Sequence, residues 1–291
     1  MSEAEAAPGA RGSAASQGHD AAEHEQDRLI ELPNGPVRVR VRGAGPALVW
    51  SHGVFFPTEV DDHSVLAHEL RHAPGFTLVR YDARGHGRTP PAARAELHRW
   101  DRLADDVLAL ADALGLERFA LGGISMGAAV ALHAALARPE RVTAMLLFAL
   151  PTAWETRPAE QARYRELLET RTPEALAARV KADLDGMFTP ETLTPALRAM
   201  VQWLRHAPWT ALERIVEGAA ASDMPDRRAL AGLDVPTLLR PWPNDAGHPL
   251  STAELLAATL PRADLALLRR HDDAPGIRGA LAELRALVGG A

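Results

Sequence analysis

A serine between two glycines, where a strand pattern gives way to a helix pattern, constrains the fold of this chain more than any other feature. The pentapeptide reads Gly123, Ile124, Ser125, Met126, Gly127. Residues 118–121 before it form a short strand pattern, and residues 126–137 after it are helix formers. At such a turn the serine takes a strained backbone conformation, and a Cβ at either flank would collide with a neighbouring element. The pattern predicts a nucleophile elbow; the alternative is a small residue at a tight turn.

The chain alternates strand and helix patterns from residue 28 onward, as a sheet with crossover helices does. The strand patterns are at residues 28–32, 37–41, 47–50, 76–81, 118–121, 142–150, 236–240 and 263–268. The run VTAMLLFAL at 142–150 is almost wholly apolar, which is typical of a parallel strand covered on both faces. The helix patterns are at residues 65–72, 101–114, 126–137, 252–260 and 277–288. The sequence therefore predicts an α/β fold, with a mostly parallel eight-stranded sheet and helices on both faces.

Two segments depart from this alternation. Between residues 151 and 214, helix patterns punctuated by prolines follow one another without a convincing strand. We expect a helical cap there, inserted into a core formed by residues 28–150 and 215–291. Residues 1–27 contain six acidic residues against one arginine and are rich in Ala, Gly and Ser, so we expect a disordered acidic tail.

Charge and composition exclude several classes of partner. The tail, with six acidic residues and one arginine, accounts for −5 of the formal charge of −6, which leaves −1 for the rest of the chain. Such a nearly neutral part offers no basic surface to nucleic acid. Because cysteine is absent, disulfides, thiolate nucleophiles and Cys-based metal sites are excluded together. No apolar run is long enough for a membrane helix and no signal-peptide pattern is present, so we expect a cytoplasmic protein without a membrane partner.

Four motifs, in order along residues 28–291, resemble those of the α/β-hydrolase fold superfamily. They are SHGV at 51–54, DARGHG at 82–87, the elbow at 123–127, and the strand at 235–239 with an acidic residue and Pro249 beyond it. Two further segments, MFTPETL at 187–193 and GLDVPTLL at 232–239, resemble the 3-oxoadipate enol-lactonase and related esterase group. The resemblance implies a hydrolase that acts on a small molecule.

The resemblance also implies a catalytic triad in the chain order serine, acid, histidine. A serine hydroxyl is a poor nucleophile at neutral pH, so it needs a base within hydrogen-bond reach and a third group that orients the base. By this resemblance Ser125 is the nucleophile, Asp245 is the acid, and His271, which follows the last strand, is the base. The backbone amides of Val54 and Met126 are the expected oxyanion hole.

Departures from the family pattern concern the loops that carry the acid and the base. An arginine pair precedes His271 where the family has a glycine, and Pro and Trp stand at 241–242 where it has a small residue and Gly. His248, three residues after Asp245, is a second candidate for the base, although it precedes the last helix and strand. Glu155 is a second candidate for the acid.

These residues predict a serine hydrolase that cleaves an ester, lactone or related carbonyl bond through an acyl-enzyme, and we expect neither a cofactor nor a metal. Thioesterase, carbon–carbon hydrolase and perhydrolase chemistry rely on the same triad and stay open, because the fold alone does not choose among them. A hydrolase-fold protein that binds a small ligand without catalysis also stays open.

A competing motif stands at residues 68–72, where HELRH matches the zinc-protease string His-Glu-x-x-His. A zinc protease needs a third ligand, and the longer form of this motif has a histidine where this chain has Leu78, inside a strand pattern. In the α/β-hydrolase fold a helix that covers the sheet stands at this point. We therefore favour a structural helix over a zinc metalloprotease site.

Overall fold

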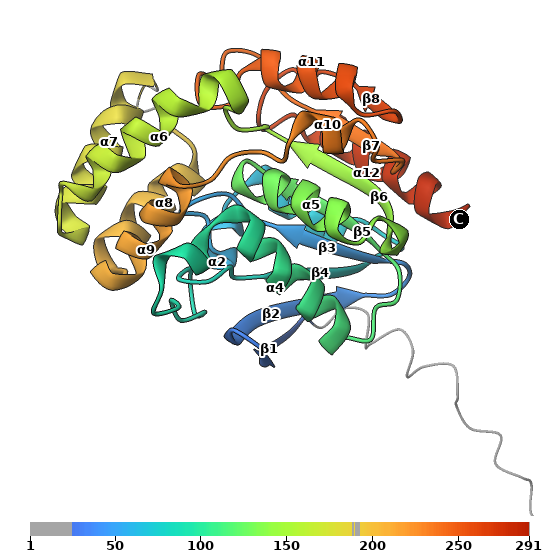
Figure 1. The fold of residues 1–291 in the computed structure, drawn as a ribbon, viewed down its shortest axis with the longest axis horizontal. Helices are drawn as coiled ribbons and strands as arrows, with labels where there is room; N and C mark the ends of the chain where they lie inside the picture. Colours follow the sequence, from blue (N-terminus) through green and yellow to red (C-terminus); the bar gives the residue numbers. More distant parts are fainter. Residues whose placement is uncertain (1–24, 188, 190–192, 291) are drawn as a thin grey trace, which may run out of the picture.

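The computed structural model of the chain describes residues 25–187, 189 and 193–290, and its centre is one eight-stranded sheet (Figure 1). The strands lie in the order β1-β2-β4-β3-β5-β6-β7-β8 across the sheet. Strand β2 runs antiparallel to β1 and β4, and the neighbours from β4 to β8 pair in parallel. The strands are β1 (Gln26–Leu32), β2 (Gly35–Gly43), β3 (Ala47–Ser51), β4 (Thr77–Tyr81), β5 (Phe119–Ile124), β6 (Val142–Phe148), β7 (Thr237–Arg240) and β8 (Ala263–Leu265).

Helices cover the sheet on both faces, which confirms the predicted fold class. One hydrophobic cluster contains buried residues of α4, α5 and α11, and a second cluster contains those of α3 and α12. These helices are α3 (Val65–His72), α4 (Trp100–Ala113), α5 (Met126–Ala137), α11 (Leu250–Thr259) and α12 (Ala274–Gly289). Shorter turns of helix are α2 (Thr58–Asp61) and α10 (Arg227–Leu230), with 3₁₀ helices at Ala95–His98, Pro139–Arg141 and Trp154–Thr156.

The burial of each element follows from its sequence pattern. Strand β6 is buried along almost its whole length, as a central parallel strand between two helical layers should be. In α4, Leu103, Val107 and Leu110 recur at helical spacing and are all buried against the sheet. Helix α5 consists mostly of alanine and leucine and is buried on nearly every side, so it fits tightly between the sheet and α4.

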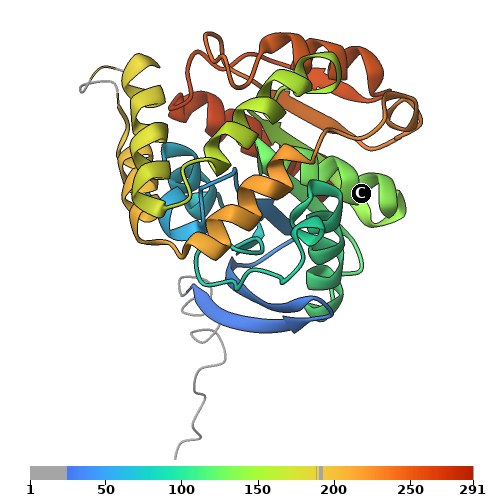
Figure 2. The same cartoon turned by 60° about the vertical axis from the view of Figure 1, so that its left-hand side comes forward.

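Four helices between β6 and β7 gather at one end of the molecule, the end toward which the β6 arrow points (Figures 1 and 2). They are α6 (Arg157–Leu168), α7 (Pro173–Met187), α8 (Pro195–His206) and α9 (Trp209–Ala220). Proline in the first turn of α6, α7 and α8 is compatible with helix initiation because its missing N–H has no helical acceptor there. Helix α9 continues to residue 220, beyond the expected boundary at 214. In the segment at 187–193, residues 188 and 190–192 lie outside the described residues.

A buried arginine fastens these helices to the core. The Arg157 guanidinium donates to the carbonyl oxygens of Ser222 at 2.7 Å and Ala219 at 2.6 Å, beside the C-terminal end of α9. The same group lies 4.2 Å from the centroid of a Trp100 ring, at the start of α4. Carbonyl oxygens at a helix C-terminus carry partial negative charge, so they compensate for the burial of this cation. Helices α6, α9 and α4 are thereby joined at one point.

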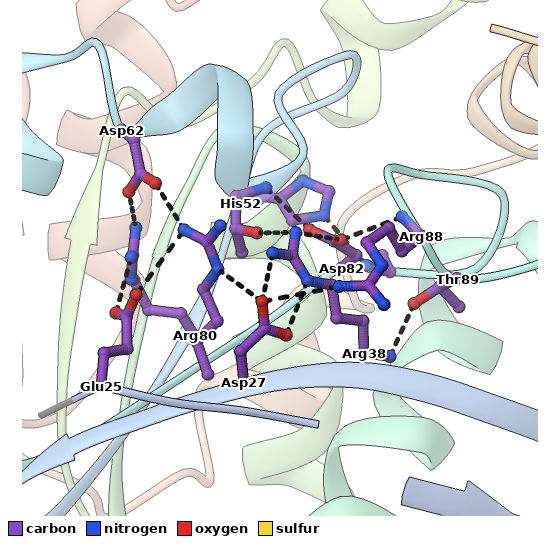
Figure 3. Close-up of polar contacts among 12 residues, drawn as sticks. Glu25, Asp27, Arg38, His52, Asp62, Arg80, Asp82, Arg88 and Thr89 are labelled. Carbon is purple, nitrogen blue, oxygen red and sulfur yellow. Dashed lines mark hydrogen bonds and ion pairs between the residues drawn. The ribbon is translucent and has the colours of Figure 1, made fainter. Parts of the chain in front are cut away.

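The expected acidic tail requires a correction at its end. Residues 1–24 lie outside the described residues, but Gln26 and Asp27 belong to β1. The Asp27 carboxylate pairs with Arg38 of β2 at 2.6 Å, and Glu25 pairs with Arg80 of β4 at 2.9 Å (Figure 3). Both arginines are buried in the sheet, and a buried guanidinium is strongly destabilising without a partner. The last acidic residues of the expected tail are therefore part of the folded protein.

Candidate active site

Ser125 lies at a sharp turn between β5 and α5, and its backbone has φ 55° and ψ −120°. The flanking glycines are required by contact. A Cβ at Gly127 would lie 2.0 Å from the carbonyl oxygen of Ser51, and one at Gly123 would lie 2.4 Å from the backbone of Gly127. No side chain fits at such distances, so the two glycines let α5 leave the sheet directly after the serine. The geometry is that of a nucleophile elbow.

Two backbone amides are candidates for binding an oxygen atom beside the serine. Met126 directly follows Ser125, and Val54 directly follows Gly53, where an added Cβ would lie 3.6 Å from Ser125 Cβ. Strands β3 and β5 are neighbours, with Ser51 opposite Gly123, so the loop after β3 passes beside the elbow. The amide of Met126 opens α5 and has no acceptor inside the helix. Among the described residues, no hydrogen-bond acceptor is recorded for the Val54 amide. Both amides are therefore available to a bound oxygen atom.

A buried carboxylate holds the loops after β3 and β4 together (Figure 3). Asp82 accepts hydrogen bonds from the amide of Thr58 at 2.7 Å and from the amide of Arg88 at 3.1 Å. The Arg38 guanidinium donates to the same carboxylate at 3.3 Å. Each donor comes from a different segment, so Asp82 fixes the loop that carries Val54 relative to the sheet.

His52, next to this loop, is a neutral structural histidine. Its Nε2 accepts from the amide of Ala83 at 3.0 Å, so its Nδ1 carries the proton and donates to the carbonyl oxygen of Gly53 at 2.8 Å. Burial lowers the pKa of His52, and the nearby Asp82 carboxylate only partly opposes that effect. His52 therefore contributes to the conformation of the loop.

The side chains of Ser125, His248 and Asp245 form a continuous hydrogen-bonded chain. His248 Nε2 lies 2.9 Å from Ser125 Oγ, and His248 Nδ1 lies 2.8 Å from Asp245 Oδ2. With the imidazole neutral, Nδ1–H donates to the carboxylate and Nε2 accepts from the serine hydroxyl. The side chains of Asp245 and His248 are each 26% exposed, so the centre is accessible to a small molecule. Both residues belong to the loop between β7 and α11.

The Asp245 carboxylate is held in its ionised form. Burial raises its pKa, and a hydrogen bond from His248 opposes that rise. Further donors are the Trp242 indole N–H at 3.0 Å and the Gly247 amide at 3.1 Å. The donors outweigh burial, and the pKa of Asp245 is below its ordinary value.

The structure differs from the expectation for the base, because it brings His248, and not His271, into contact with Ser125 and Asp245. Strand β8 is short, and after it the Leu268 amide bonds to the carbonyl oxygen of Pro241 at 2.8 Å. Residues 269–273 then form one tight turn closed by Asp273, and α12 begins at the next residue. His271 is at this turn, with its ring edge-on to Trp242 at 6.3 Å between centroids. A turn of this length does not extend to the serine.

The sequence does contain a signal that favours His248 as the residue in contact with Ser125. The family pattern, which places the base after the last strand, favours His271 instead. Asp245 and His248 are three residues apart, and the His248 amide bonds to the carbonyl oxygen of Asp245 at 3.2 Å, so one turn brings both side chains together. Gly247 lies within this turn, and Pro249 precedes the first residue of α11. The chain order serine, acid, histidine is still obeyed.

The remaining candidates are engaged elsewhere. Glu155, the second candidate for the acid, is exposed and pairs with Arg227 at 3.0 Å. In the segment HELRH of α3, Glu69 pairs with Arg278 at 2.8 Å, while His72 Nδ1 donates to the carbonyl oxygen of His68 at 2.7 Å. Within the described ranges, no group of three or more His, Cys, Asp or Glu side chains is arranged to hold a metal ion. The segment does not form a zinc-protease centre within that part of the chain.

Comparison with known proteins agrees with the fold. The model of the alpha/beta hydrolase fold family matches residues 46–199, which is more than half of the chain. The chain belongs to the α/β-hydrolase fold family. The AB hydrolase superfamily protein YisY of Bacillus subtilis is 29% identical over 77% of this chain and 83% of its own length. An epoxide hydrolase of Caballeronia sordidicola is 28% identical over 61% of this chain, but this chain covers only 54% of that relative.

Solved structures show the same fold. The enol-lactonase from Burkholderia xenovorans LB400 aligns with a TM-score of 0.68 and 19% identity, over 90% of this chain and all of its own. The esterase from Exiguobacterium antarcticum aligns with a TM-score of 0.74, also at 19% identity over 90% of this chain and all of its own.

None of the described helices combines the length and the apolar character needed to cross a bilayer.

Proposed function

We propose that this protein is a serine hydrolase of small-molecule esters or lactones, with Ser125 as nucleophile, His248 as general base and Asp245 as the acid that orients His248. The observation that carries the proposal is the chain of contacts from Ser125 Oγ to His248 Nε2 at 2.9 Å and from His248 Nδ1 to Asp245 Oδ2 at 2.8 Å. These distances are within the range over which a positioned base accepts a proton from a serine hydroxyl.

In the proposed reaction, Ser125 Oγ attacks the carbonyl carbon of the substrate while its proton passes to His248 Nε2. The resulting imidazolium is stabilised by Asp245, which stays ionised. The tetrahedral intermediate collapses when the bond to the leaving oxygen breaks and His248 returns its proton to that oxygen. A water molecule then attacks the acyl-enzyme with His248 again as base, and its products are the acid and free Ser125.

The amides of Val54 and Met126 are the proposed oxyanion hole for both tetrahedral intermediates. For neither N–H is an acceptor recorded among the described residues, and the two come from the loop after β3 and from the start of α5. A donor aimed at the developing oxyanion is worth a factor of about 10²–10³ in rate. Because Asp82 holds the first loop in place, the donors are preorganised before the substrate binds.

Helices α6–α9 are the proposed cap of the substrate site. A hollow of about 660 Å³ lies between α2 of the core and α8, with Trp203 in its wall. Trp203 stacks on His86 with ring centroids 6.0 Å apart, and His86 lies edge-on to His52 at 4.7 Å. Packed rings of Trp203, His86 and His52 therefore lie between the hollow and the loop that carries Val54. We propose that the acyl or alcohol group of the substrate lies between helices α6–α9 and Ser125, which directly follows the carboxyl end of β5.

The proposal is tested with a fluorophosphonate probe and a p-nitrophenyl acetate assay on the same purified protein. We expect one covalent adduct, located on Ser125, and loss of both labelling and turnover in Ser125→Ala. The expected loss of turnover is at least about 10³-fold, because the triad residues act as a unit. A folded wild-type protein that takes no label would instead favour a ligand-binding protein, and undiminished turnover in Ser125→Ala would exclude this nucleophile.

A further inference from the structure

The loop between β7 and α11 contains a third side chain in contact with the catalytic pair. Trp242 Nε1–H donates to Asp245 Oδ2 at 3.0 Å, and the same oxygen accepts from His248 Nδ1 at 2.8 Å. The second oxygen, Oδ1, accepts from the Gly247 amide at 3.1 Å. We propose that Trp242 is a positioning residue for the reaction, which holds the Asp245 carboxylate where it directs His248 toward Ser125. The inference rests on the proposed function.

The need for such a residue follows from the position of Asp245. The acid lies five residues beyond the end of β7, after Asn244, whose φ is 62°. No strand hydrogen bond is recorded for Asp245 itself within the described chain. A carboxylate on such a loop rotates about χ1 and χ2 unless donors fix both oxygens. The backbone of the turn supplies only the Gly247 donor to Oδ1, so Oδ2 depends on a side chain.

Trp242 is anchored well enough to supply that donor. It lies between Pro241 and Pro243, whose rings restrict the backbone on either side. The carbonyl oxygen of Pro241 accepts from the Leu268 amide at 2.8 Å, which ties this part of the loop to the segment after β8. The indole itself packs against the hydrophobic cluster that lies between the sheet, α3 and α12. The position of its N–H is therefore set by the core rather than by the loop.

The chemistry explains how the contact acts. A carboxylate oxygen has two lone pairs, so Oδ2 can accept from the indole N–H and from His248 Nδ1–H at the same time. Without the indole N–H, the carboxylate can rotate or accept from water, and the imidazole is less often oriented on Ser125 Oγ. Hydrogen bonds to an ionised carboxylate also favour its ionised form, which stabilises the imidazolium of the intermediate. Trp242 affects the rate only through Asp245.

The His271 loop has a supporting role in this arrangement. The His271 ring stands edge-on to the indole, at 6.3 Å between centroids and 64° between planes. No hydrogen-bond partner is recorded for its buried Nε2 within the described part of the chain. The ring therefore packs against Trp242.

The test compares Trp242→Phe with a matched control, Trp154→Phe. Trp154 is also half-buried and donates its indole N–H to the carbonyl oxygen of Pro225 at 2.9 Å, but it lies in the 3₁₀ helix Trp154–Thr156, outside both the triad loop and helices α6–α9. We expect Trp242→Phe to lower kcat for p-nitrophenyl acetate by about 10- to 100-fold, as for loss of a hydrogen bond to a charged group. We expect KM to stay within about twofold and the control to keep wild-type kcat.

A double-mutant cycle separates positioning from a general loss of structure. In the Asp245→Ala background Trp242 has no carboxylate to hold, so we expect Trp242→Phe to change kcat there by less than about twofold. An equal loss of kcat from Trp242→Phe in the wild-type and Asp245→Ala backgrounds would overturn the proposal. A Trp242→Phe single variant with wild-type kcat would overturn it as well. If the phenylalanine variant does not fold, benzothienylalanine at position 242 keeps the ring volume and removes only the N–H, and the same outcomes apply. Fluorophosphonate labelling of the wild type tests the proposed function separately.

Discussion

The loops after β7 and after β8 each contain a histidine, an aspartate and a tight turn, yet only the first reaches the serine. Residues 241–249 bring Asp245 and His248 to Ser125. Residues 266–273 instead pack against the core and lead into α12. The Leu268 side chain lies in a hydrophobic cluster, and the Asp273 side chain accepts a hydrogen bond from the Gly276 amide at the start of α12. Side-chain chemistry does not distinguish the two loops. They differ in where their backbones are fastened.

The path of each loop, and not its place in the strand order, decides which histidine contacts the serine. The segment after β8 stays hydrogen-bonded alongside the end of β7 as far as Leu268, and only a five-residue turn separates that point from α12. In the loop after β7, no backbone hydrogen bond to a strand is recorded from Trp242 to His248 within the described part of the chain. This loop can therefore turn toward the elbow.

The largest expected effect distinguishes the two histidines directly. We expect His248→Ala to lower kcat/KM for p-nitrophenyl acetate by at least about 10³-fold, because the serine loses its base. We expect His271→Ala to stay within about threefold of wild type, because its ring contributes only packing. Steady-state kinetics at pH 7.5 measures both variants, and urea unfolding shows that each is folded. The comparison fails if His271→Ala loses as much activity as His248→Ala.

A smaller effect concerns the structural role of the second loop. Leu268 is 5% exposed and packs in the cluster that includes Ile277 and Leu281 of α12. We expect Leu268→Ala to lower the free energy of unfolding by about 2–4 kcal/mol through lost burial and a cavity. Because no triad residue is moved, kcat should change by less than about threefold. Urea denaturation and steady-state kinetics on the same sample measure both quantities. A large loss of kcat in folded Leu268→Ala protein would contradict a purely structural role for this loop.

The smallest expected effect is a loss of stability at low pH. It limits the pH range in which the activities of variants in the two loops can be compared. Burial, reinforced by the Arg84 guanidinium, lowers the pKa of His98 to about 4, so the folded protein binds fewer protons there than the unfolded chain. Stability from this group is fully present above pH 6.5 and is lost as the pH falls toward 4. Between pH 7.5 and 5 we expect a loss on the order of 1 kcal/mol from His98. Urea titrations at both pH values should show a smaller difference in His98→Gln; an equal difference would contradict this cause.

Much of the fold follows from local pattern, because periodicity and turn residues decide strands and helices one at a time. Helices at Val65–His72 and Met126–Ala137 have the predicted bounds. The elbow is predictable for the same reason. Its two glycines are required by close contacts with residues nearby in the sequence and with the end of one neighbouring strand. The predicted end of the acidic tail at residue 27 was wrong. Asp27 and Glu25 form ion pairs with the buried arginines Arg38 and Arg80 and so belong to the folded part of the chain.

Which histidine contacts Ser125 was not predictable by the same means. A strand pattern at 263–268 suggests a longer β8 than the observed Ala263–Leu265, and a longer strand would end nearer to His271. Only the three-dimensional path shows that the chain turns into α12 at once. Trp242 was visible as a departure from the family pattern, but its hydrogen bond to Asp245 depends on the conformation of the loop.

The closeness of Asp245 and His248 along the chain has a consequence for how the centre assembles during folding. Bringing two parts of a chain together costs entropy that grows with the length of the loop they close. Ser125 and His248 are 123 residues apart, whereas Asp245 and His248 are separated by only three. The proposed acid and base can therefore meet as a local turn, and a single long-range closure brings them to Ser125. A base contributed by the segment before α12 would have required a second closure.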